Sequence, residues 1–385
     1  MRRTYMDANA TTPLLSEVVE AMRPYWMEHF GNASSIHYQG QQARKAVDRA
    51  RETVAQLFGC HEAEVVFNSG GTEGANTAVF GLLRPGDHLI TTAIEHSAVL
   101  QAAERVAARG VDVTHIAPLP NGLVDPEAIQ SAIGPRTRLV SVILANNETG
   151  VIQPVAEIGR IAADAGAYFH IDAVQGAGKI ALDVRKFGCH LLSVSAHKMH
   201  GPKGVGAMYV RKGTPMDSLI VGGSHERRRR AGTENVTGIV GLGKAAESAI
   251  ECLKDGAIDR VSVLRDILEF ELVKIAGAMV NGAGAPRTAN TTNIRFAEIE
   301  GEAMVIALDL KGVSVSSGAA CSSGTTEPSH VLLAMGLTKN EALQSLRFSL
   351  LRTATESDVD HVLEIVPTVV EKLRAHSPVG ALAAG

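Results

Sequence analysis

The chain has 385 residues, of which 45% are hydrophobic and 20% are charged, as in a soluble globular protein large enough for about two or three domains. Its formal net charge of −4 argues against a general nucleic-acid-binding protein. Its apolar runs are too short for a membrane-spanning helix, which needs roughly 20 residues.

The N-terminal 60 residues are expected to be mostly helical. Residues 1–13 are expected to form an arm, residues 14–30 a helix, and residues 31–37 a loop rich in turn-forming residues. Residues 41–58 place Ala, Val and Leu side chains on one side at helical spacing, which predicts an amphipathic helix.

From residue 65 onwards, strand-like and helix-like runs alternate. Such alternation predicts an α/β fold with a mostly parallel sheet covered by helices on both faces. The predicted strands are residues 65–67, 88–92, 112–116, 139–144, 168–171, 191–195 and 205–210. The predicted helices between them are residues 73–83, 98–109, 125–133 and 155–165.

The C-terminal part predicts a smaller α+β domain. Residues 222–235 are expected to form a loop, and residues 236–276 a long helical region. A glycine pattern within this region resembles a dinucleotide-binding motif. That motif needs a preceding strand, which is missing here, so the pattern is assigned to the helix. Strands are predicted at residues 293–296 and 346–349, and helices at 301–311 and 356–373. We therefore expect an arm at residues 1–13 that joins the small domain, a large domain at 14–260 and a small domain at 261–385.

The stretch 191–206 is the first candidate for chemistry. An apolar strand there ends in Ser195, His197 and Lys198 and then runs into glycines and a proline. Open α/β folds place their active sites at such strand ends, and a lysine among hydroxyl and imidazole groups suits a Schiff base with a carbonyl cofactor. Ser195 and His197 would then hold a phosphate. The alternative is a surface lysine in a glycine-rich turn.

Two further stretches favour a cofactor. Asp172 ends an apolar run, and a carboxylate there would keep a pyridine nitrogen protonated, as pyridoxal phosphate (PLP) chemistry requires; the alternative role for Asp172 is a helix N-cap. Gly70, Gly71 and Thr72 follow a predicted strand and open a helix, where free N–H groups attract phosphate. The alternative there is a plain strand–turn–helix connection.

The four cysteines are far apart and form no Cys-x-x-Cys pair, so we expect no intrinsic metal site. Unpaired cysteines and the lack of a signal peptide favour a cytoplasmic protein. Cys321 lies among small polar residues at 314–326, which predicts an exposed, mobile segment with a reactive thiol. The other three, Cys60, Cys189 and Cys252, are expected to be structural.

Seven motifs occur in one order along the chain. They are Ser-Gly-Gly-Thr at residues 69–72, Glu-His-Ser at 95–97, Asn-Asn-Glu-Thr-Gly at 146–150, His-x-Asp-x-x-Gln at 170–175, Ser-x-His-Lys at 195–198, Gly-Thr-Glu-Asn at 232–235 and Ser-Gly-x-x-Cys at 317–321. Together they resemble the cysteine desulfurases, PLP enzymes of fold type I (the aspartate-aminotransferase-like fold). The Gly-Thr-Glu-Asn form is most similar to the nitrogen-fixation branch, and the resemblance runs from residue 5 to about residue 378.

The resemblance implies a large domain with a mostly parallel seven-stranded sheet, a smaller α+β domain and a homodimer. It implies that L-cysteine becomes L-alanine while its sulfur passes to Cys321 as a persulfide. The sulfur would then supply iron–sulfur cluster assembly through a scaffold or another acceptor protein, with Cys321 also able to ligate a nascent cluster.

The resemblance also implies a role for each site residue. Lys198 would bind the cofactor and later act as a base, His96 would stack on the ring and transfer protons, and Cys321 would be the nucleophile. The implied cofactor-binding set is Gly71, Thr72, His96, Asp172, Gln175, Ser195, His197, Lys198 and, from a second subunit, Thr233. Asn147 and Arg352 would bind the substrate carboxylate.

This sequence departs from the family pattern at two places. Leu351 stands before Arg352 where many relatives have glycine, and Glu226 is followed by four arginines rather than Arg-Gly-x-Arg. Two alternatives to a desulfurase stay open at this point: a selenocysteine lyase or other β-eliminating PLP enzyme, and a non-enzymatic scaffold that uses Cys321 only as a ligand.

Overall fold

The computed structural model describes residues 2–317, 320–322 and 325–375, and contains a seven-stranded sheet in the order β2-β8-β7-β6-β5-β3-β4. The strands are β2 (Val65–Asn68), β3 (His88–Thr92), β4 (Asp112–Ile116), β5 (Thr137–Ile143), β6 (Tyr168–Asp172), β7 (Leu191–Ser195) and β8 (Gly206–Val210). The pairs among β3, β4, β5, β6 and β7 are parallel, whereas β8 is antiparallel to both of its neighbours, β2 and β7. The ten residues between β7 and β8 are too few for the crossover that a parallel pair needs, so β8 returns antiparallel. The predicted fold class is confirmed.

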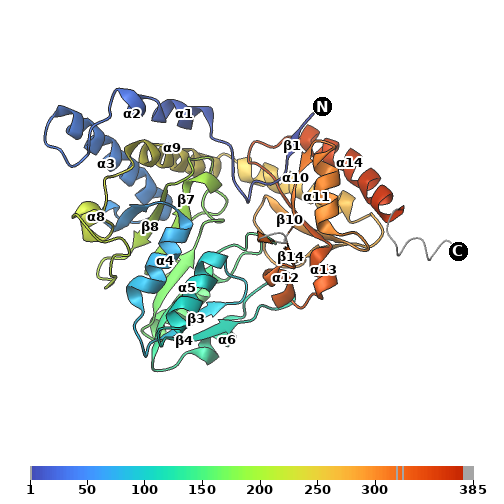
Figure 1. The fold of residues 1–385 in the computed structure, drawn as a ribbon, viewed down its shortest axis with the longest axis horizontal. Coiled ribbons are helices and arrows are strands. Elements are labelled where there is room, and N and C mark those ends of the chain that lie inside the picture. Colours follow the sequence, from blue (N-terminus) through green and yellow to red (C-terminus); the bar gives the residue numbers. More distant parts are fainter. Residues whose placement is uncertain (1, 318–319, 323–324, 376–385) are drawn as a thin grey trace.

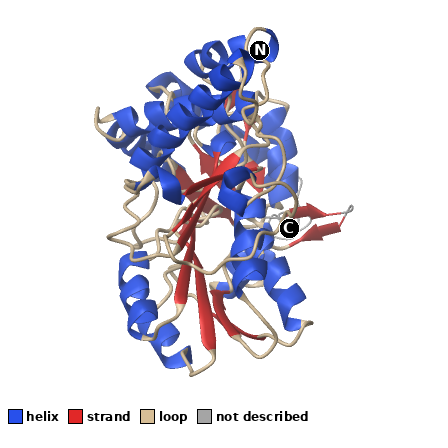
Figure 2. Ribbon diagram, turned by 90° about the vertical axis from the view of Figure 1, so that its left-hand side faces the viewer, coloured by secondary structure: helices blue, strands red, loops and turns tan. Residues whose placement is uncertain are grey.

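Helices cover both faces of this sheet (Figures 1 and 2). Alternate residues of β2 show why: Val65 and Phe67 pack with Val47 of α3 (Tyr38–Phe58), whereas Val66 packs with Val79 of α4 (Gly71–Leu82). Successive strand residues point to opposite faces, so a strand that is apolar throughout must be buried on both. The other helices around the sheet are α1 (Ser16–Met22), α2 (Pro24–Met27), α5 (Ser97–Ala107), α6 (Pro126–Ala132), α7 (Val155–Asp164) and α9 (Val236–Cys252), with short 3-10 turns at Glu62–Glu64 and Ala196–Lys198.

A second, four-stranded antiparallel sheet has the order β12-β15-β10-β9. Its strands are β9 (Ala278–Asn281), β10 (Thr291–Phe296), β12 (Ser316–Ser317) and β15 (Ser345–Ser349), and the accompanying helices are α10 (Ala257–Leu272), α11 (Gly301–Asp309) and α14 (Glu356–Ala375). These elements share their own hydrophobic cluster and lie to the right in Figure 1. The N-terminal arm joins them, because β1 (Thr4–Tyr5) pairs in parallel with β11 (Val313–Ser314).

Several elements differ from the sequence-based expectation. The helix predicted at 14–30 is two helices, because Pro24 has no N–H to continue the first one. The region 236–276 is also two helices, separated at Gly256, whose φ of 80° breaks the helical path. The predicted loop at 222–235 contains the short turn α8 (His225–Arg228). Strand β9 and the helices α12 (His330–Ala334) and α13 (Lys339–Leu343) were not predicted.

The segment 314–326, predicted to be exposed and mobile, contains β12 and the hairpin of β13 (Ala320–Ser322) and β14 (Thr325–Glu327), and its mobility stays a prediction. None of the described helices is both long and apolar enough to cross a membrane.

Candidate active site

A cavity of about 340 Å³ lies at the carboxyl ends of β5, β6 and β7. It brings together nine residues that the sequence predicted for the site: Gly71, Thr72, His96, Asn147, Asp172, Gln175, Ser195, His197 and Lys198. Asn9 of the N-terminal arm and Arg347 of β15 also line it. Both units of the fold and the arm therefore contribute to one site.

One end of the cavity is built for an anion. Helix α4 begins at Gly71, so the N–H groups of Gly71 and Thr72 have no partner within the helix and face the cavity end. Gly70 has a φ of 142°, a conformation that favours glycine. A Cβ on Gly71 would lie 2.4 Å from Cγ2 of Val174, so no larger residue fits. With the hydroxyls of Thr72 and Ser195, this cradle has the donors that a phosphate needs.

His197 also lines the cavity. Its Nδ1 forms a 3.1 Å hydrogen bond with Oγ1 of Thr11, and burial, together with the charges of Lys198 and Lys203, lowers its pKa to about 4. At neutral pH the ring is therefore uncharged and carries one N–H, which can donate a hydrogen bond to an acceptor in the cavity.

Asp172 also lines the cavity and is 4% exposed. Its Oδ1 accepts a 3.0 Å hydrogen bond from the N–H of Val174, which uses one of its two oxygens and resembles the capping contact considered for it. Burial raises the pKa of this carboxyl, whereas the N–H of Val174 and the charges of His96 and Lys198 partly offset the rise. A buried carboxylate needs a positive partner, and a protonated ring nitrogen would supply one.

His96 is the N-cap of α5, since its Nδ1 accepts a 3.1 Å hydrogen bond from the N–H of Ala98. Because Nδ1 accepts, the ring proton sits on Nε2. Burial lowers the pKa of His96, and the positive charges of Lys198 and His330 add to that effect, while Asp172 opposes it. His96 therefore presents a neutral ring to the cavity.

Lys198 ends the 3-10 turn that follows β7. Its Nζ donates to the carbonyl oxygens of Asn9 at 2.6 Å and Ala10 at 2.7 Å. Burial and the charge of Arg347 lower its pKa to about 8, although Asp172 is one of two carboxylates that oppose the shift. An amine with such a pKa is partly neutral near pH 7, as a Schiff-base lysine or a general base must be.

The sequence model for aminotransferase class-V matches residues 4–362 of this chain. The chain belongs to the class-V aminotransferase family. It is 48% identical over 378 residues to a cysteine desulfurase of Trichormus azollae, covering 97% of this chain and 94% of the relative. It is 46% identical over 382 residues to cysteine desulfurase IscS of Dictyoglomus turgidum, covering 98% and 97%.

Solved structures agree with these sequence matches. A NifS-like protein superposes with a TM-score of 0.90 at 36% identity, covering 96% of this chain and all of the other. A structure of SspA in complex with cysteine superposes with a TM-score of 0.80 at 33% identity, covering 90% and 98%. These desulfurase-type members of the class-V aminotransferase family are PLP-dependent, so PLP is the cofactor that the cavity must fit.

The cavity of this class-V aminotransferase fits PLP at three points. The glycine cradle and hydroxyls suit the phosphate, the buried carboxylate of Asp172 suits the ring nitrogen, and Lys198 suits the aldehyde. The described residues contain no cluster of three or more His, Cys, Asp or Glu side chains that could hold a metal ion.

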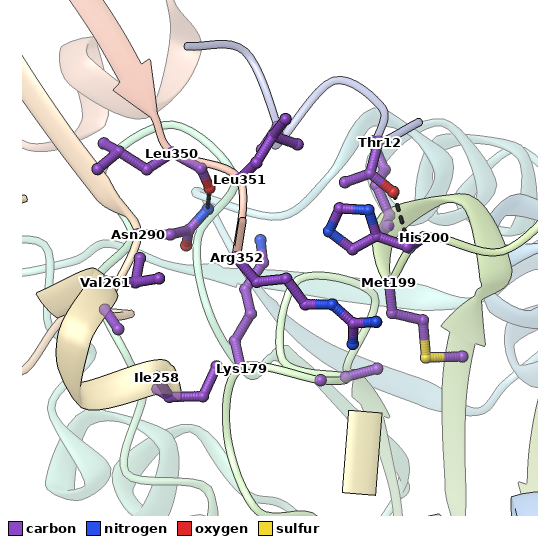
Figure 3. A pocket seen from close by; sticks show the side chains of 15 residues that line it. Thr12, Lys179, Met199, His200, Ile258, Val261, Asn290, Leu350, Leu351 and Arg352 are labelled. Carbon is purple, nitrogen blue, oxygen red and sulfur yellow. Dashed lines mark hydrogen bonds between the residues drawn. The ribbon is translucent and has the colours of Figure 1, made fainter. Parts of the chain in front are cut away.

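Arg352, predicted to bind the substrate carboxylate, does not line this cavity. Its guanidinium donates a 2.7 Å hydrogen bond to Oγ of Ser248 and lies at a separate small cavity with Lys179 and His200 (Figure 3). Arg352 comes three residues after β15 has ended, so the sheet no longer directs it to the site. The prediction for Arg352 is corrected: the arginine in the PLP cavity is Arg347.

Arg347 lies within β15, where it interrupts an otherwise apolar and small-residue strand. Its guanidinium donates to the carbonyl oxygen of Asn147 at 3.0 Å and to Oδ1 of Asp7 at 2.7 Å, and its Nε is buried with no partner among the described residues. The sequence signal was a charged residue inside a short buried strand, which costs stability unless it serves a site.

Thr233 is exposed and does not line the PLP cavity of its own subunit. The preceding Gly232 shares a small cavity with Ser69, which lies in the loop leading to α4. The role of Thr233 stays a prediction, because it depends on a second copy of the chain.

The backbone of Cys321 lies in β13, opposite Thr326, whereas its side chain lies outside the described part of the structure. The chain after this hairpin is attached at the rim of the site. Oγ of Ser329 donates a 2.5 Å hydrogen bond to Oε2 of Glu148, and Nε2 of His330 bonds the carbonyl oxygen of Glu95 at 2.9 Å. Glu148 and Glu95 directly adjoin Asn147 and His96, so the hairpin ends beside the cavity.

The three other cysteines are poor nucleophiles. Burial raises the pKa of Cys60 and of Cys189 to about 12, and it also raises the pKa of Cys252. Because the thiolate is the reactive form, these thiols are held in their inert state.

Proposed function

We propose that this class-V aminotransferase is a cysteine desulfurase that converts L-cysteine into L-alanine and passes the sulfur to Cys321 as a persulfide. The observation that carries the proposal is one cavity that combines Lys198, Asp172 and Arg347, with the Cys321 hairpin attached at its rim. The relatives named cysteine desulfurase, and the structure of SspA with cysteine, support the same chemistry.

Bound PLP would supply an electron sink for the pair released at the substrate Cα. Asp172 would hold a proton on the ring nitrogen, and Nζ of Lys198 would take the Cα proton, since its pKa of about 8 suits transfer near neutral pH. His96, neutral with its proton on Nε2, would move a proton above the ring.

Arg347 and Asn147 would bind the substrate carboxylate. The buried Nε of Arg347 has no hydrogen-bond acceptor among the described residues, and a substrate carboxylate would supply one. The two other nitrogens of the guanidinium are held in place by Asn147 and Asp7. A guanidinium held in place by its neighbours can receive a carboxylate with little loss of side-chain entropy.

In the sulfur transfer, the Cys321 thiolate would attack the substrate sulfur. The new S–S bond forms as the substrate C–S bond breaks, and the electron pair of that bond stays with the carbon skeleton, which takes up protons and leaves as alanine. No external oxidant is needed, because the two electrons that the sulfur loses on becoming part of the persulfide are kept by the carbon skeleton, which is reduced to that of alanine. The persulfide sulfur would pass to an iron–sulfur scaffold or another acceptor in the cytoplasm; the narrower assignment to nitrogen fixation rests on the resemblance alone.

We also propose a homodimer in which Thr233 completes the phosphate site of the second copy. Three large apolar side chains near this loop are strongly exposed: Phe30 at 71%, Ile36 at 90% and Val221 at 82%. The segments carrying them are adjacent, since Ser34 and Gly223 line one cavity. Such a concentration of exposed apolar residues is typical of a protein interface.

The test is product analysis with L-cysteine and L-selenocysteine side by side. A desulfurase releases alanine and places added sulfur on Cys321, detectable by mass spectrometry, whereas a β-eliminating enzyme releases pyruvate and ammonia. The Cys321→Ser variant should still bind PLP and L-cysteine but form no persulfide, because a serine hydroxyl is a much poorer nucleophile than a thiolate. A purified protein that stays colourless with added PLP would instead favour the scaffold alternative.

A further inference from the structure

A second lysine, Lys179, lies behind the PLP cavity and has no part in the chemistry above. It is half-buried and lines the same small cavity as Arg352 (Figure 3). Lys198 lines that cavity too. Its Nζ donates to Oε1 of Gln175 at 2.7 Å and to Oδ1 of Asn9 at 2.8 Å. Burial and the positive charges of Lys198 and Arg347 lower its pKa to about 7, so keeping this amine here is costly and calls for a reason.

Two contacts set which way round the Gln175 side chain is held, and Lys179 makes the one to its oxygen. An ammonium group has donors only, so an amide that faces it must present its oxygen. Within the described residues, Lys179 is the one donor to Oε1 of Gln175. The amide nitrogen is then turned to the other side, where it donates to the carbonyl oxygen of Asn9 at 2.9 Å and borders the PLP cavity.

Asn9 depends much less on Lys179. Its Oδ1 also accepts from Nδ2 of Asn290 at 3.1 Å, and its Nδ2 donates to the carbonyl oxygen of Asn147 at 3.1 Å and to Oγ1 of Thr291 at 2.9 Å. These contacts would keep Asn9 in place without the lysine. Gln175 is the side chain that depends on Lys179, because the lysine is the partner of its oxygen while the carbonyl oxygen of Asn9 is the partner of its nitrogen.

We propose that Lys179 is a positioning residue that, together with the carbonyl oxygen of Asn9, holds the Gln175 amide with its nitrogen at the PLP cavity. The inference rests on the proposed PLP function, in which the family resemblance makes Gln175 the partner of the ring hydroxyl. It adds a residue that helps to hold the Gln175 amide in the orientation needed to donate to that oxygen. The second N–H of Gln175 is available to an acceptor in the cavity, and an anionic ring oxygen is stabilised by this donor and by the nearby positive charge.

The test is a pH titration of the visible absorption of PLP bound to the Lys179→Met variant, which keeps the chain length but loses the charge and the donors. We expect the titration midpoint to rise by about one pH unit and the PLP dissociation constant to rise about tenfold, since one charge-assisted hydrogen bond contributes roughly 1.5–3 kcal/mol. Lys179→Arg, which restores a cationic donor, should recover most of the shift. Lys186→Met, at a lysine whose side chain is 82% exposed, should change neither quantity.

The decisive comparison repeats Lys179→Met in a Gln175→Ala background. If Lys179 acts through Gln175, the second substitution should add little to the first. Equal effects of Lys179→Met in both backgrounds, or an unchanged midpoint in the single variant, would overturn the inference. If Lys179→Met does not fold, Lys179→Gln replaces it in the same cycle. A wild-type protein that shows no PLP absorption band would refute the proposed function itself. That result is distinct from a wild-type protein that binds PLP normally and a Lys179→Met variant with an unchanged midpoint.

Discussion

At the scale of single residues, the site depends on groups whose charge is set by burial. Burial lowers the pKa values of Lys198, His197 and Lys179 and raises the pKa of Asp172. Such shifts concentrate at functional sites. Here they leave the amines partly neutral and the imidazole uncharged, which is the state that binding and proton transfer require.

The choice between two arginines gives the first prediction. Arg347→Met should raise KM for L-cysteine about 10- to 100-fold, because the substrate carboxylate loses charge-assisted hydrogen bonds of roughly 1.5–3 kcal/mol. Arg352→Met is the matched control, since its guanidinium bonds Ser248 outside the cavity. Steady-state kinetics measure both. A larger increase in KM from Arg352→Met than from Arg347→Met would show that Arg352 binds the substrate carboxylate after all.

The second prediction concerns the stability of the cofactor-free protein. The folded-state pKa of Lys198 is about 8, below the roughly 10.4 of an unfolded lysine, so the unfolded chain binds more protons between these values. Stability therefore rises with pH through this window, and the lysine is most destabilising at low pH. Lys198→Met should raise the apoprotein Tm at pH 7, with the advantage shrinking from pH 8 to 10. A constant or growing advantage would contradict the pKa, and the same variant should lose all turnover.

At the scale of elements, the phosphate cradle is braced by a distant loop. Glu73 on α4 accepts from the N–H of Ser69 at 2.8 Å and from Nε of Arg230 at 3.0 Å. At the start of the same arginine run, Glu226 pairs with buried Arg51 at 2.7 Å and accepts from the N–H of Phe67 at 2.9 Å. The loop thus holds both the strand and the helix that flank the cradle.

The third prediction follows from this brace. Arg230→Met should weaken PLP binding about tenfold, because Glu73 loses its positive partner and holds Ser69 less firmly. Arg228→Gly is the control: Arg228 has a φ of 66°, which favours glycine, and we expect the same PLP affinity with no loss in Tm. PLP titration of the apoprotein measures the affinities. An unchanged affinity in Arg230→Met would show that the cradle needs no brace.

The attachment of the Cys321 hairpin gives the fourth prediction. Ser329→Ala removes the hydroxyl that donates to buried Glu148 and caps α12 through the N–H of Leu332. Persulfide formation should slow about tenfold while PLP affinity stays unchanged, since only the approach of the hairpin is altered. Ser357→Ala, at a surface hydroxyl bonded to Arg2, is the control. Equal loss of PLP affinity and of sulfur transfer would indicate general destabilisation instead.

At the scale of the whole molecule, Asn9 joins the parts that form the site. Its carbonyl oxygen accepts from Lys198 and Gln175 of the large unit, while its amide and N–H contact Thr291 and Ser349 of the small unit. The N-terminal arm is therefore a structural link between two hydrophobic clusters as well as a wall of the cavity.

The fifth prediction tests the homodimer. Ile36→Asp places a charge in the exposed apolar group beside the Thr233 loop, so it should convert the dimer into a monomer and weaken PLP binding. Leu310→Asp is the matched control, because Leu310 is 69% exposed but follows α11 in the small unit. Sedimentation together with PLP titration measures both effects. A wild-type protein that is monomeric and fully active would remove the proposed role of Thr233.

The sequence by itself determined the family, the PLP cofactor and the sheet, because strand and helix periodicity and the ordered motifs are local properties of the chain. Nine of the predicted site residues share one cavity, since each follows a strand end or opens a helix, whereas their roles stay predictions. Three things were decided only by tertiary structure. Arg347 rather than Arg352 lies in the cavity, Lys179 faces Gln175, and Ser329 and His330 attach the Cys321 hairpin. Each of these features depends on contacts between segments that lie far apart in the sequence, and no local pattern relates such segments. Each also depends on the side of the sheet to which the chain turns after a strand ends.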